Sequence, residues 1–170
     1  MLDRRMAAAI NDQINYEYYS AFIYLSMSAQ FAALGLPGGA NWMNVQFQEE
    51  LAHAMKLFTY LTERGAKVEL QAIEAPASEW PNALAMFETA LEHEGKVTVR
   101  INHLADLALE LKEHASHNML QWFIAEQVEE EANAEEMIQK LKLTKDAPGG
   151  MFQLDNEMAA RVYVPPAPAV

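Results

Sequence analysis

The segment 43–61, MNVQFQEELAHAMKLFTYL, shows the apolar spacing of a helix with one buried face. A carboxylate, Glu50, interrupts the apolar stripe near its middle, although a buried carboxylate is costly unless something compensates its charge. Arg64-Gly65 follows, and this glycine suits the position just after a helix C-terminus. The segment therefore predicts a helix that carries an acid into the core, on a stripe made of Met43, Phe47, Glu50, Ala54, Leu57 and Leu61.

Three other segments show the same period, and each of their stripes is also interrupted by polar residues. A helix is predicted from Asp3 to about Phe31, a second in which Pro81 suits the first turn, and a third along 120–141. Four helices that each place polar groups at a similar depth indicate a shared site rather than chance. The three stripes are Met6, Ile10, Gln13, Glu17, Ser20, Tyr24, Met27 and Phe31; Leu84, Phe87, Leu91, Glu94, Val97, Ile101 and Ala105; and Leu120, Phe123, Gln127, Glu130, Ala134, Met137 and Leu141.

The lengths of the connections predict an all-α four-helix bundle over about residues 3–145. The break at 34–39 is short, so the helices that it joins should be antiparallel neighbours, and the same holds for the turn at about 110–116. The 15 residues of 66–80 reach about 50 Å when extended, which exceeds the ~44 Å of a 29-residue helix. We therefore expect a long crossover that makes the second and third helices parallel. A short fifth helix at about 150–162 and a frayed tail at 163–170 complete a single predicted domain, 1–170.

The composition of the 170 residues excludes several classes of protein. The chain has no cysteine, which rules out a disulfide scaffold, a thiolate nucleophile, a Cys-ligated metal site and an iron–sulfur cluster. A formal charge of −12 is a poor match for nucleic acid but suits the attraction of cations. The chain shows neither a run of 18 apolar residues nor a signal peptide, so we expect no membrane partner and a cytoplasmic location.

The polar residues of the stripes have the spacing of a di-iron carboxylate bundle. Such bundles use one Glu from each of two helices and a Glu-x-x-His motif from each of the other two. Glu17 and Glu94 are the single residues here, and Glu50-Leu51-Ala52-His53 is one full motif. The fourth helix departs from the pattern with Gln127 and Glu130. An oxygen-rich set with one imidazole suits iron or manganese better than a structural zinc ion.

We expect Glu50 to bridge two metal ions. The first predicted site consists of Glu17, Glu50 and His53, and the second of Glu50, Glu94 and Glu130. Gln127 should lie near the position of dioxygen or behind the metal ligands.

The sequence resembles the ferritin family, and most closely the bacterial non-haem ferritins, over essentially the whole chain. The segments NYEYYS at 15–20, QEELAH at 48–53, HE at 93–94 and LQWFIAEQVEEE at 120–131 carry the resemblance. It implies a cage of 24 subunits in which a ferroxidase centre oxidises Fe(II) with O2 or H2O2 and deposits a ferric oxyhydroxide mineral. The ferroxidase ligands of the family fall on Glu17, Glu50, His53, Glu94 and Glu130, with Gln127 in the site.

The resemblance also implies residues around that centre. A third iron site would fall on Glu49, Glu126 and Glu129, which would share Glu130. The redox-active tyrosine of the family falls on Tyr24, and Trp122 matches a neighbouring aromatic position. Haem is not expected, because Leu51 stands where bacterioferritins carry their haem-ligating Met; Met43 and Met55 are then interpreted as core residues.

Two alternative functions remain open at this stage. One is a di-iron oxidase that turns over an organic substrate without storing iron. The other is a structural or signalling four-helix bundle that binds no metal, against which the acids in the core and the lack of disulfides both argue.

Overall fold

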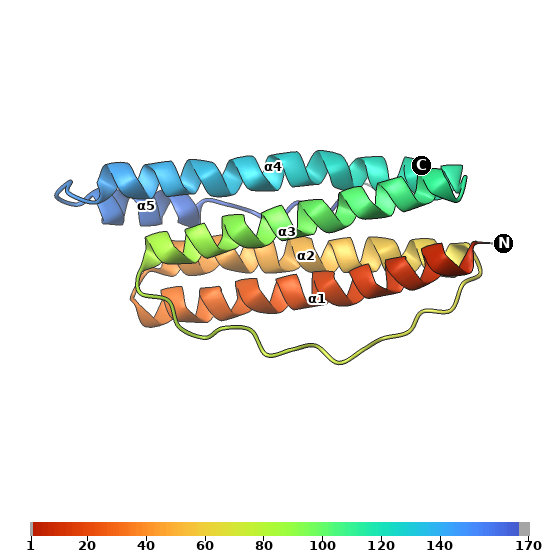
Figure 1. Cartoon of the computed structure of the whole chain (residues 1–170). Helices are drawn as coiled ribbons and strands as arrows, with labels where there is room; N and C mark the ends of the chain where they lie inside the picture. The colour runs from red at the N-terminus through yellow and green to blue at the C-terminus, as the bar shows by residue number, and fades with distance from the viewer. Residues whose placement is uncertain (1, 167–170) are drawn as a thin grey trace.

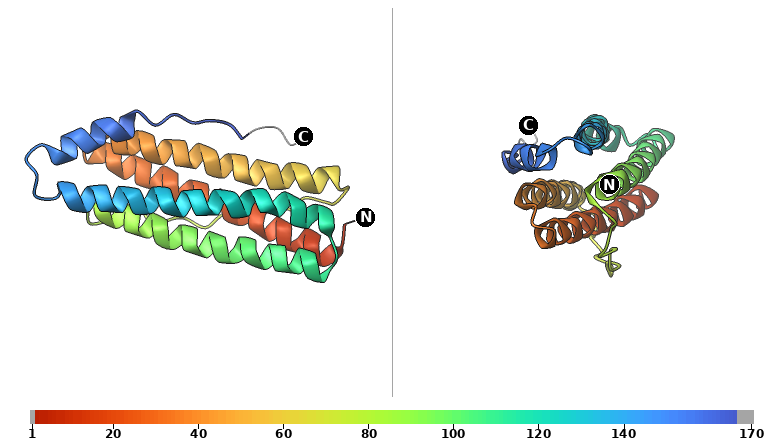
Figure 2. Two further views of the ribbon diagram at one scale, coloured as in Figure 1. Left: turned by 90° about the horizontal axis from the view of Figure 1, so that it is seen from above. Right: turned by 90° about the vertical axis from the view of Figure 1, so that its left-hand side faces the viewer.

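The computed structural model describes residues 2–166, which form five helices and no strand (Figure 1). α1 is Arg4–Ala33, α2 is Pro37–Glu63, α3 is Ala83–Glu110, α4 is His114–Thr144 and α5 is Gly150–Ala159. The helices α1 and α2 form one antiparallel pair, and α3 and α4 form another (Figures 1 and 2). The predicted all-α bundle with a short C-terminal helix is confirmed. None of the described helices combines the length and apolarity needed to cross a bilayer.

The predicted crossover is also confirmed, since α2 and α3 run in the same direction (Figure 1). The connection extends from one end of the bundle to the other without helix or strand. Asn11 in α1 fixes its course: the side-chain amide donates to the carbonyl of Lys67, and its oxygen accepts from the N–H of Glu69. Near its end, Gln30 both donates to the carbonyl of Trp80 and accepts from its N–H.

The helix ends follow from local sequence signals, with one correction. Asp3 caps α1, as its carboxylate accepts from the N–H of Arg5. Gly65 follows α2 with a φ of 67°, as its predicted place after the helix implies. Pro81 was expected in the first turn of α3, but the helix begins at Ala83. The Asn82 side chain accepts from the N–H of Ala85 and so caps the helix one residue after the proline.

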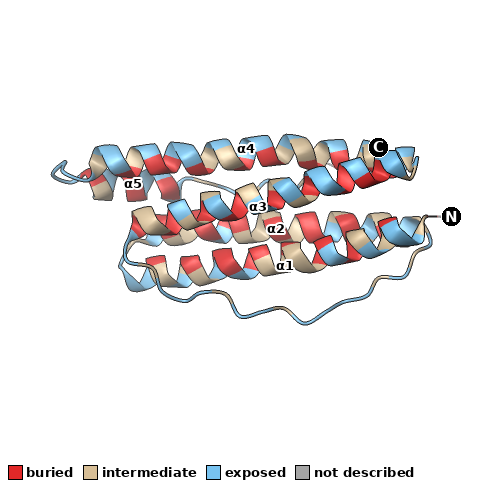
Figure 3. Cartoon of the chain, in the orientation of Figure 1, coloured by how far each residue is buried: buried red, intermediate tan, exposed pale blue. Residues whose placement is uncertain are grey.

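The core consists of two apolar clusters separated by a polar layer. One cluster includes Met27, Phe31 and Phe87, and the other, towards the N-terminus of α1, includes Ile10 and Leu57. Figure 3 shows the buried residues of the four long helices facing the interior of the bundle. The polar layer lies along the middle of the helices, where the stripes of the sequence are interrupted.

The fifth helix packs at the end of the bundle where α2 begins. The Asp155 carboxylate accepts from the N–H of Gly39, which lies in the first turn of α2. Gly38 lies so close to α5 that a Cβ there would come within 1.6 Å of the Asp155 carbonyl oxygen. The helix ends at Ala159, before the predicted end at Val162, and the following residues run back along the bundle (Figure 2). Of the predicted frayed tail, residues 167–170 lie outside the described part of the chain.

Candidate metal centre

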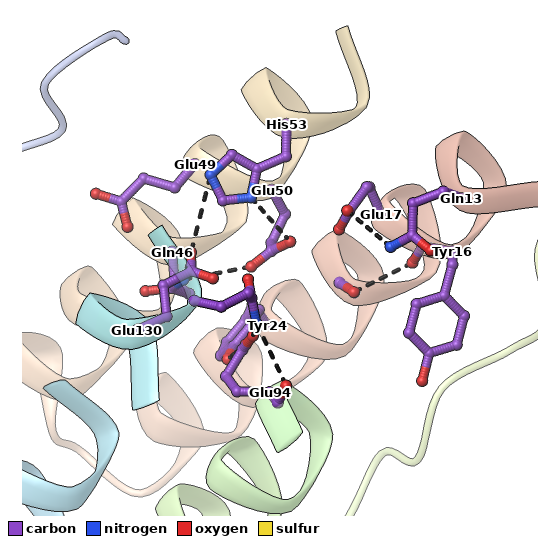
Figure 4. Close-up of polar contacts among 12 residues, drawn as sticks. Gln13, Tyr16, Glu17, Tyr24, Gln46, Glu49, Glu50, His53, Glu94 and Glu130 are labelled. Carbon is purple, nitrogen blue, oxygen red and sulfur yellow. Dashed lines mark hydrogen bonds and ion pairs between the residues drawn. The ribbon is translucent and has the colours of Figure 1, made fainter. Parts of the chain in front are cut away.

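The polar side chains that interrupt the four stripes meet in one layer of the bundle. α1 and α3 contribute one residue each, and α2 and α4 contribute two each. All are buried, and the most accessible, Glu130, is only 8% exposed. Figure 4 shows the carboxylates of α1, α2, α3 and α4 converging from separate helices. The residues in the layer are Glu17, Glu50, His53, Glu94, Gln127 and Glu130.

Five of these residues form two groups that share Glu50. Glu17, Glu50 and His53 each offer a ligand atom, and these atoms all lie within 4.8 Å of one another. Glu50, Glu94 and Glu130 do the same. Within residues 2–166 no other three His, Asp or Glu side chains meet this distance. The structure thus brings together the two groups that the sequence assigns to two sites, while their role as ligands stays a prediction.

Three carboxylate oxygens in this layer are buried and accept no hydrogen bond from the described residues, 2–166: Oε2 of Glu17, of Glu50 and of Glu130. Buried polar atoms in folded proteins nearly always have a partner, because an unpaired one costs about 1–3 kcal/mol. The three oxygens are divided between the two groups. Cations placed among them would supply the missing partners, so the donor set fits a pair of metal ions.

Burial also disturbs the ionisation of the layer. Desolvation raises the pKa of Glu50 well above its usual range, and the nearby charges of Glu94 and Glu17 raise it further. The pKa of Glu130 is raised in the same way, first by burial and then by Glu50 and Glu94. Burial likewise raises the pKa values of Glu17 and Glu94. Without cations the layer therefore holds protons, which a bound metal ion would displace.

Two glutamines that the sequence reasoning left without a role orient these acids. Gln13 donates to Oε1 of Glu17 at 2.9 Å. Gln46 donates to Oε1 of Glu50 at 3.3 Å and to Oε1 of Glu130 at 3.0 Å. Each glutamine lies four residues before the Glu of its own helix, so the shared Gln-x-x-x-Glu spacing is a signal that could have identified both.

Tyr24 and Gln127 both lie behind Glu94. The buried Tyr24 hydroxyl donates to Oε1 of Glu94, and Gln127 donates to Oε2 of Glu94 at 3.3 Å and to the Thr98 hydroxyl at 3.2 Å. Burial, followed by the charge of Glu94, raises the pKa of Tyr24 well above its usual range. Gln127 thus contacts Glu94 from α4, and its place near dioxygen or behind the metal ligands stays a prediction.

The residues of the predicted third site line a single pocket of about 430 Å³ beside the layer. Its lining includes Glu49, Glu126 and Glu129 as well as His53 and Glu130 of the layer. The three outer acids do not converge as closely as the two central groups do. Glu49 is engaged by Arg161, a residue to which the sequence reasoning gave no role.

The structure also places the other residues that the sequence singled out, and one of them is not where we expected it. Trp122 lies against the centre, with its ring edge-on to His53 at a centroid distance of 5.4 Å. His93, which lies next to Glu94 on α3, shares a hydrogen bond of 2.7 Å with the Ser20 hydroxyl, and burial lowers its pKa to about 4. Met43 is a core residue as expected. The assignment of Met55 to the core is wrong: its side chain is 47% exposed and accepts a hydrogen bond from the Tyr18 hydroxyl.

A crossover bundle that directs buried carboxylates and one histidine from four helices into a shared layer defines the class of di-metal carboxylate proteins. Comparison with known proteins gives the family within that class. The model of the ferritin-like domain matches residues 7–144. The chain therefore belongs to the ferritin family.

Named relatives and solved structures agree with this membership. A probable bacterial non-heme ferritin-like protein of Haemophilus influenzae is 39% identical over 93% of this chain and 96% of its own length. A bacterial non-heme ferritin of Bacteroides fragilis is 37% identical over 95% of this chain and 100% of its own. An engineered closed form of the Archaeoglobus fulgidus ferritin is 48% identical, covering 96% of this chain and 100% of its own, with a TM-score of 0.95. The resemblance to bacterial non-haem ferritins is confirmed, and the predicted class of iron-storage protein with ferroxidase activity agrees with it.

Proposed function

We propose that this protein oxidises Fe(II) at the buried carboxylate layer and stores the ferric product inside a closed assembly of identical chains. The observation that carries the proposal is the set of three buried carboxylate oxygens, on Glu17, Glu50 and Glu130, that accept no hydrogen bond from residues 2–166. Such a set is costly in a core of apolar residues and becomes favourable once cations bind.

Two Fe(II) ions bind side by side in this proposal, with Glu50 as the bridging ligand. One lies among Glu17, Glu50 and His53, the other among Glu50, Glu94 and Glu130; the atoms of each group approach within 4.8 Å. Each ion gives up one electron to O2 or H2O2, and two protons complete the reduction to H2O2 or to water. Catalysing both electron transfers at one site avoids the release of one-electron products.

Additional electrons and ions enter from residues around the pair. Glu49, Glu126 and Glu129 line the adjoining pocket and would hold a third cation there. Tyr24, which donates a hydrogen bond to Glu94, would supply an electron to the pair. Gln127 would hold Glu94 in place through its hydrogen bond to Oε2.

Storage requires an assembly, since one bundle cannot enclose a mineral. We infer a cage of 24 copies with closed symmetry, in which residues 1–170 act as a single ferritin-like domain. Ferritin structures with TM-scores of 0.94–0.95 to this chain support a common architecture. Large apolar side chains on the helix surfaces, including Leu143 at 81% and Val128 at 70% exposure, are available for contacts between copies. A cytoplasmic location stays a prediction.

Aerobic addition of Fe(II) tests the proposal directly. The absorbance of ferric iron should rise in a fast phase that saturates at about two ions per chain, followed by slower growth. Size separation should then show hundreds of irons with a particle of roughly 24 chains. A di-iron oxidase acting on an organic substrate would retain only a few irons per chain.

The variant Glu50→Ala should lose the fast phase and keep the assembly, because its carboxylate belongs to both groups. Glu92→Ala is the control, since Glu92 is 71% exposed and pairs with Lys96 on the surface of α3. Rapid oxidation by Glu50→Ala would refute the bridging assignment.

A further inference from the structure

The pocket beside the metal centre is bordered by the segment that follows α5. Its lining includes Arg161, Val162, Val164, Pro165 and Pro166, opposite the acids of α2 and α4. Figure 2 shows this segment running back along the bundle after α5. The C-terminal segment therefore forms part of the pocket lining, together with the acids of α2 and α4.

Arg161 makes the tightest contacts of this segment. Its Nη2 donates to Oε2 of Glu49 at 2.6 Å and to Oε1 of Gln46 at 3.0 Å. The guanidinium also stacks on Trp42, with Cζ 4.2 Å from the ring centroid, and Nη1 donates to the Trp42 carbonyl at 3.4 Å. Its partners lie at i, i+4 and i+7 of α2 and so share one helix face. In Figure 4 the Glu49 side chain points away from Glu50 and the rest of the layer.

The backbone of the segment is fixed at the same place. Asn41 of α2 donates to the carbonyl of Arg161 at 2.9 Å and, at 3.3 Å, to those of Met158 and Ala159. The backbone around Arg161 is thus itself bound to α2, which holds the guanidinium next to Glu49. Gln46 links the contact to the layer, since its amide oxygen accepts from Arg161 while its amide nitrogen donates to Glu50 and Glu130.

We propose that Arg161 is an ionic latch that takes the place of a cation on Glu49 and closes the outer side of the pocket. The proposal rests on the third cation site proposed above. A cation that enters the pocket must compete with the guanidinium for the Glu49 carboxylate. When it wins, Arg161 is released and the segment 162–166 loses its ionic attachment to α2. Arg161 is therefore a positioning residue that sets how strongly the pocket holds its ion.

Titration of the assembled, metal-free protein with Zn²⁺, followed by calorimetry, measures the competition without redox chemistry. Wild type should bind a tight pair of ions and a weaker third ion per chain. In Arg161→Ala the Kd of the third ion should fall about fivefold, the upper range for a partly exposed ion pair. Arg161→Lys, which keeps the charge but loses the fork that reaches two acceptors, should lie between.

Two further variants separate the latch from a general change of charge. Lys140→Ala removes the same charge from an α4 residue that pairs with Glu136 and Glu157 but lies outside this pocket, and it should change the third Kd less than twofold. In a Glu49→Gln background, Arg161→Ala should change the Kd of the third ion less than twofold, because the carboxylate charge for which the guanidinium and the cation compete is gone.

Trypsin gives a second readout on the unmodified protein. Zn²⁺ at the third site should accelerate cleavage after Arg161 several-fold and leave cleavage after Lys145 unchanged. Equal third-ion Kd values in wild type and Arg161→Ala, or no acceleration of cleavage, would refute the latch while the third site stands. Absence of a third ion in both proteins would refute the third site and the latch together. If wild type bound no tight pair of Zn²⁺ ions, the proposed function itself would be refuted.

Discussion

Replacing Glu50 by Gln should stabilise the metal-free protein and abolish its stabilisation by metal, two effects of opposite sign from one substitution. Glu50 is 1% exposed and belongs to both groups, which bring Glu17, Glu94 and Glu130 close to it, so its charge is unfavourable whenever cations are absent. The amide of Gln has nearly the same shape and no charge. An isosteric change should therefore relieve repulsion without opening a cavity.

The magnitude follows from the distances in the layer. At 4.8 Å, two carboxylate charges in a medium of effective dielectric constant ~20 repel by about 3.5 kcal/mol. The raised pKa of Glu50 means that protonation already relieves part of this repulsion at neutral pH. A gain of about 1–3 kcal/mol remains, which corresponds to an increase in Tm of about 2–12 °C for a chain of this size.

Thermal unfolding of chelator-treated protein, with and without Zn²⁺, measures both effects. Wild type should gain stability when Zn²⁺ is added, because the ion binds the folded state, whereas Glu50→Gln should start higher and gain little. Glu92→Gln, the same change at an exposed position, should alter Tm by no more than about 1–2 °C. A lower metal-free Tm for Glu50→Gln, together with an undiminished response to Zn²⁺, would refute the reasoning that places repelling charges in this layer.

Three further outcomes follow from the same structure. The free energy of unfolding of the metal-free protein should fall as the pH rises from about 4.5 through the raised pKa values of Glu50 and Glu130, because the folded state retains protons that the unfolded chain releases. Chemical denaturation at several pH values measures this dependence. A free energy of unfolding that rises over this pH range would contradict the prediction. Gly38→Ala should destabilise the docking of α5 by about 1–3 kcal/mol, because its Cβ would collide with the Asp155 carbonyl. Gly95→Ala is the control: its Cβ would meet no atom of the described residues within 4 Å, so the change should be neutral or stabilising. Denaturant titrations measure both. Tyr24→Phe should leave Zn²⁺ stoichiometry intact but remove any tyrosyl radical signal from electron paramagnetic resonance during Fe(II) oxidation, and persistence of that signal would reassign the electron donor.

Periodicity was sufficient to predict most of the bundle. The four stripes are long and regular, and the length of the connection 66–80 constrains the topology before any contact is known. The ends of the helices were harder to predict, because each end depends on the hydrogen bonds of one or two capping residues. Pro81 predicts that α3 starts at the proline, but the helix starts two residues later because Asn82 caps it. At α5, the side chain of Asn41 binds the carbonyls of Met158 and Ala159, where the helix ends.

The acids of the site could be predicted for a related reason. An acid inside an apolar stripe is conspicuous, so Glu17, Glu50 and Glu94 were identified from their own helices. The role of Arg161 could not be predicted in this way. Its partners lie on α2, more than 110 residues earlier in the chain, and only the return of the segment after α5 brings them together. Long-range polar contacts of this kind leave no periodic pattern in the sequence.

The two apolar clusters on either side of the metal layer account for how a site of mutually repelling acids can exist in a folded protein. α1 has 30 residues and is therefore about 45 Å long. The layer occupies only its middle turns, with Ile10 buried on one side and Phe31 on the other. Apolar packing in both directions can hold the four helices together when the layer is empty, unlike small metal-dependent domains, in which the binding energy of the ion is the folding energy. In the proposed function the centre passes its ferric product onward and so loses its ions in every cycle, which requires a scaffold that does not depend on them. The length of the helices on both sides of the layer is what makes that turnover compatible with a stable fold.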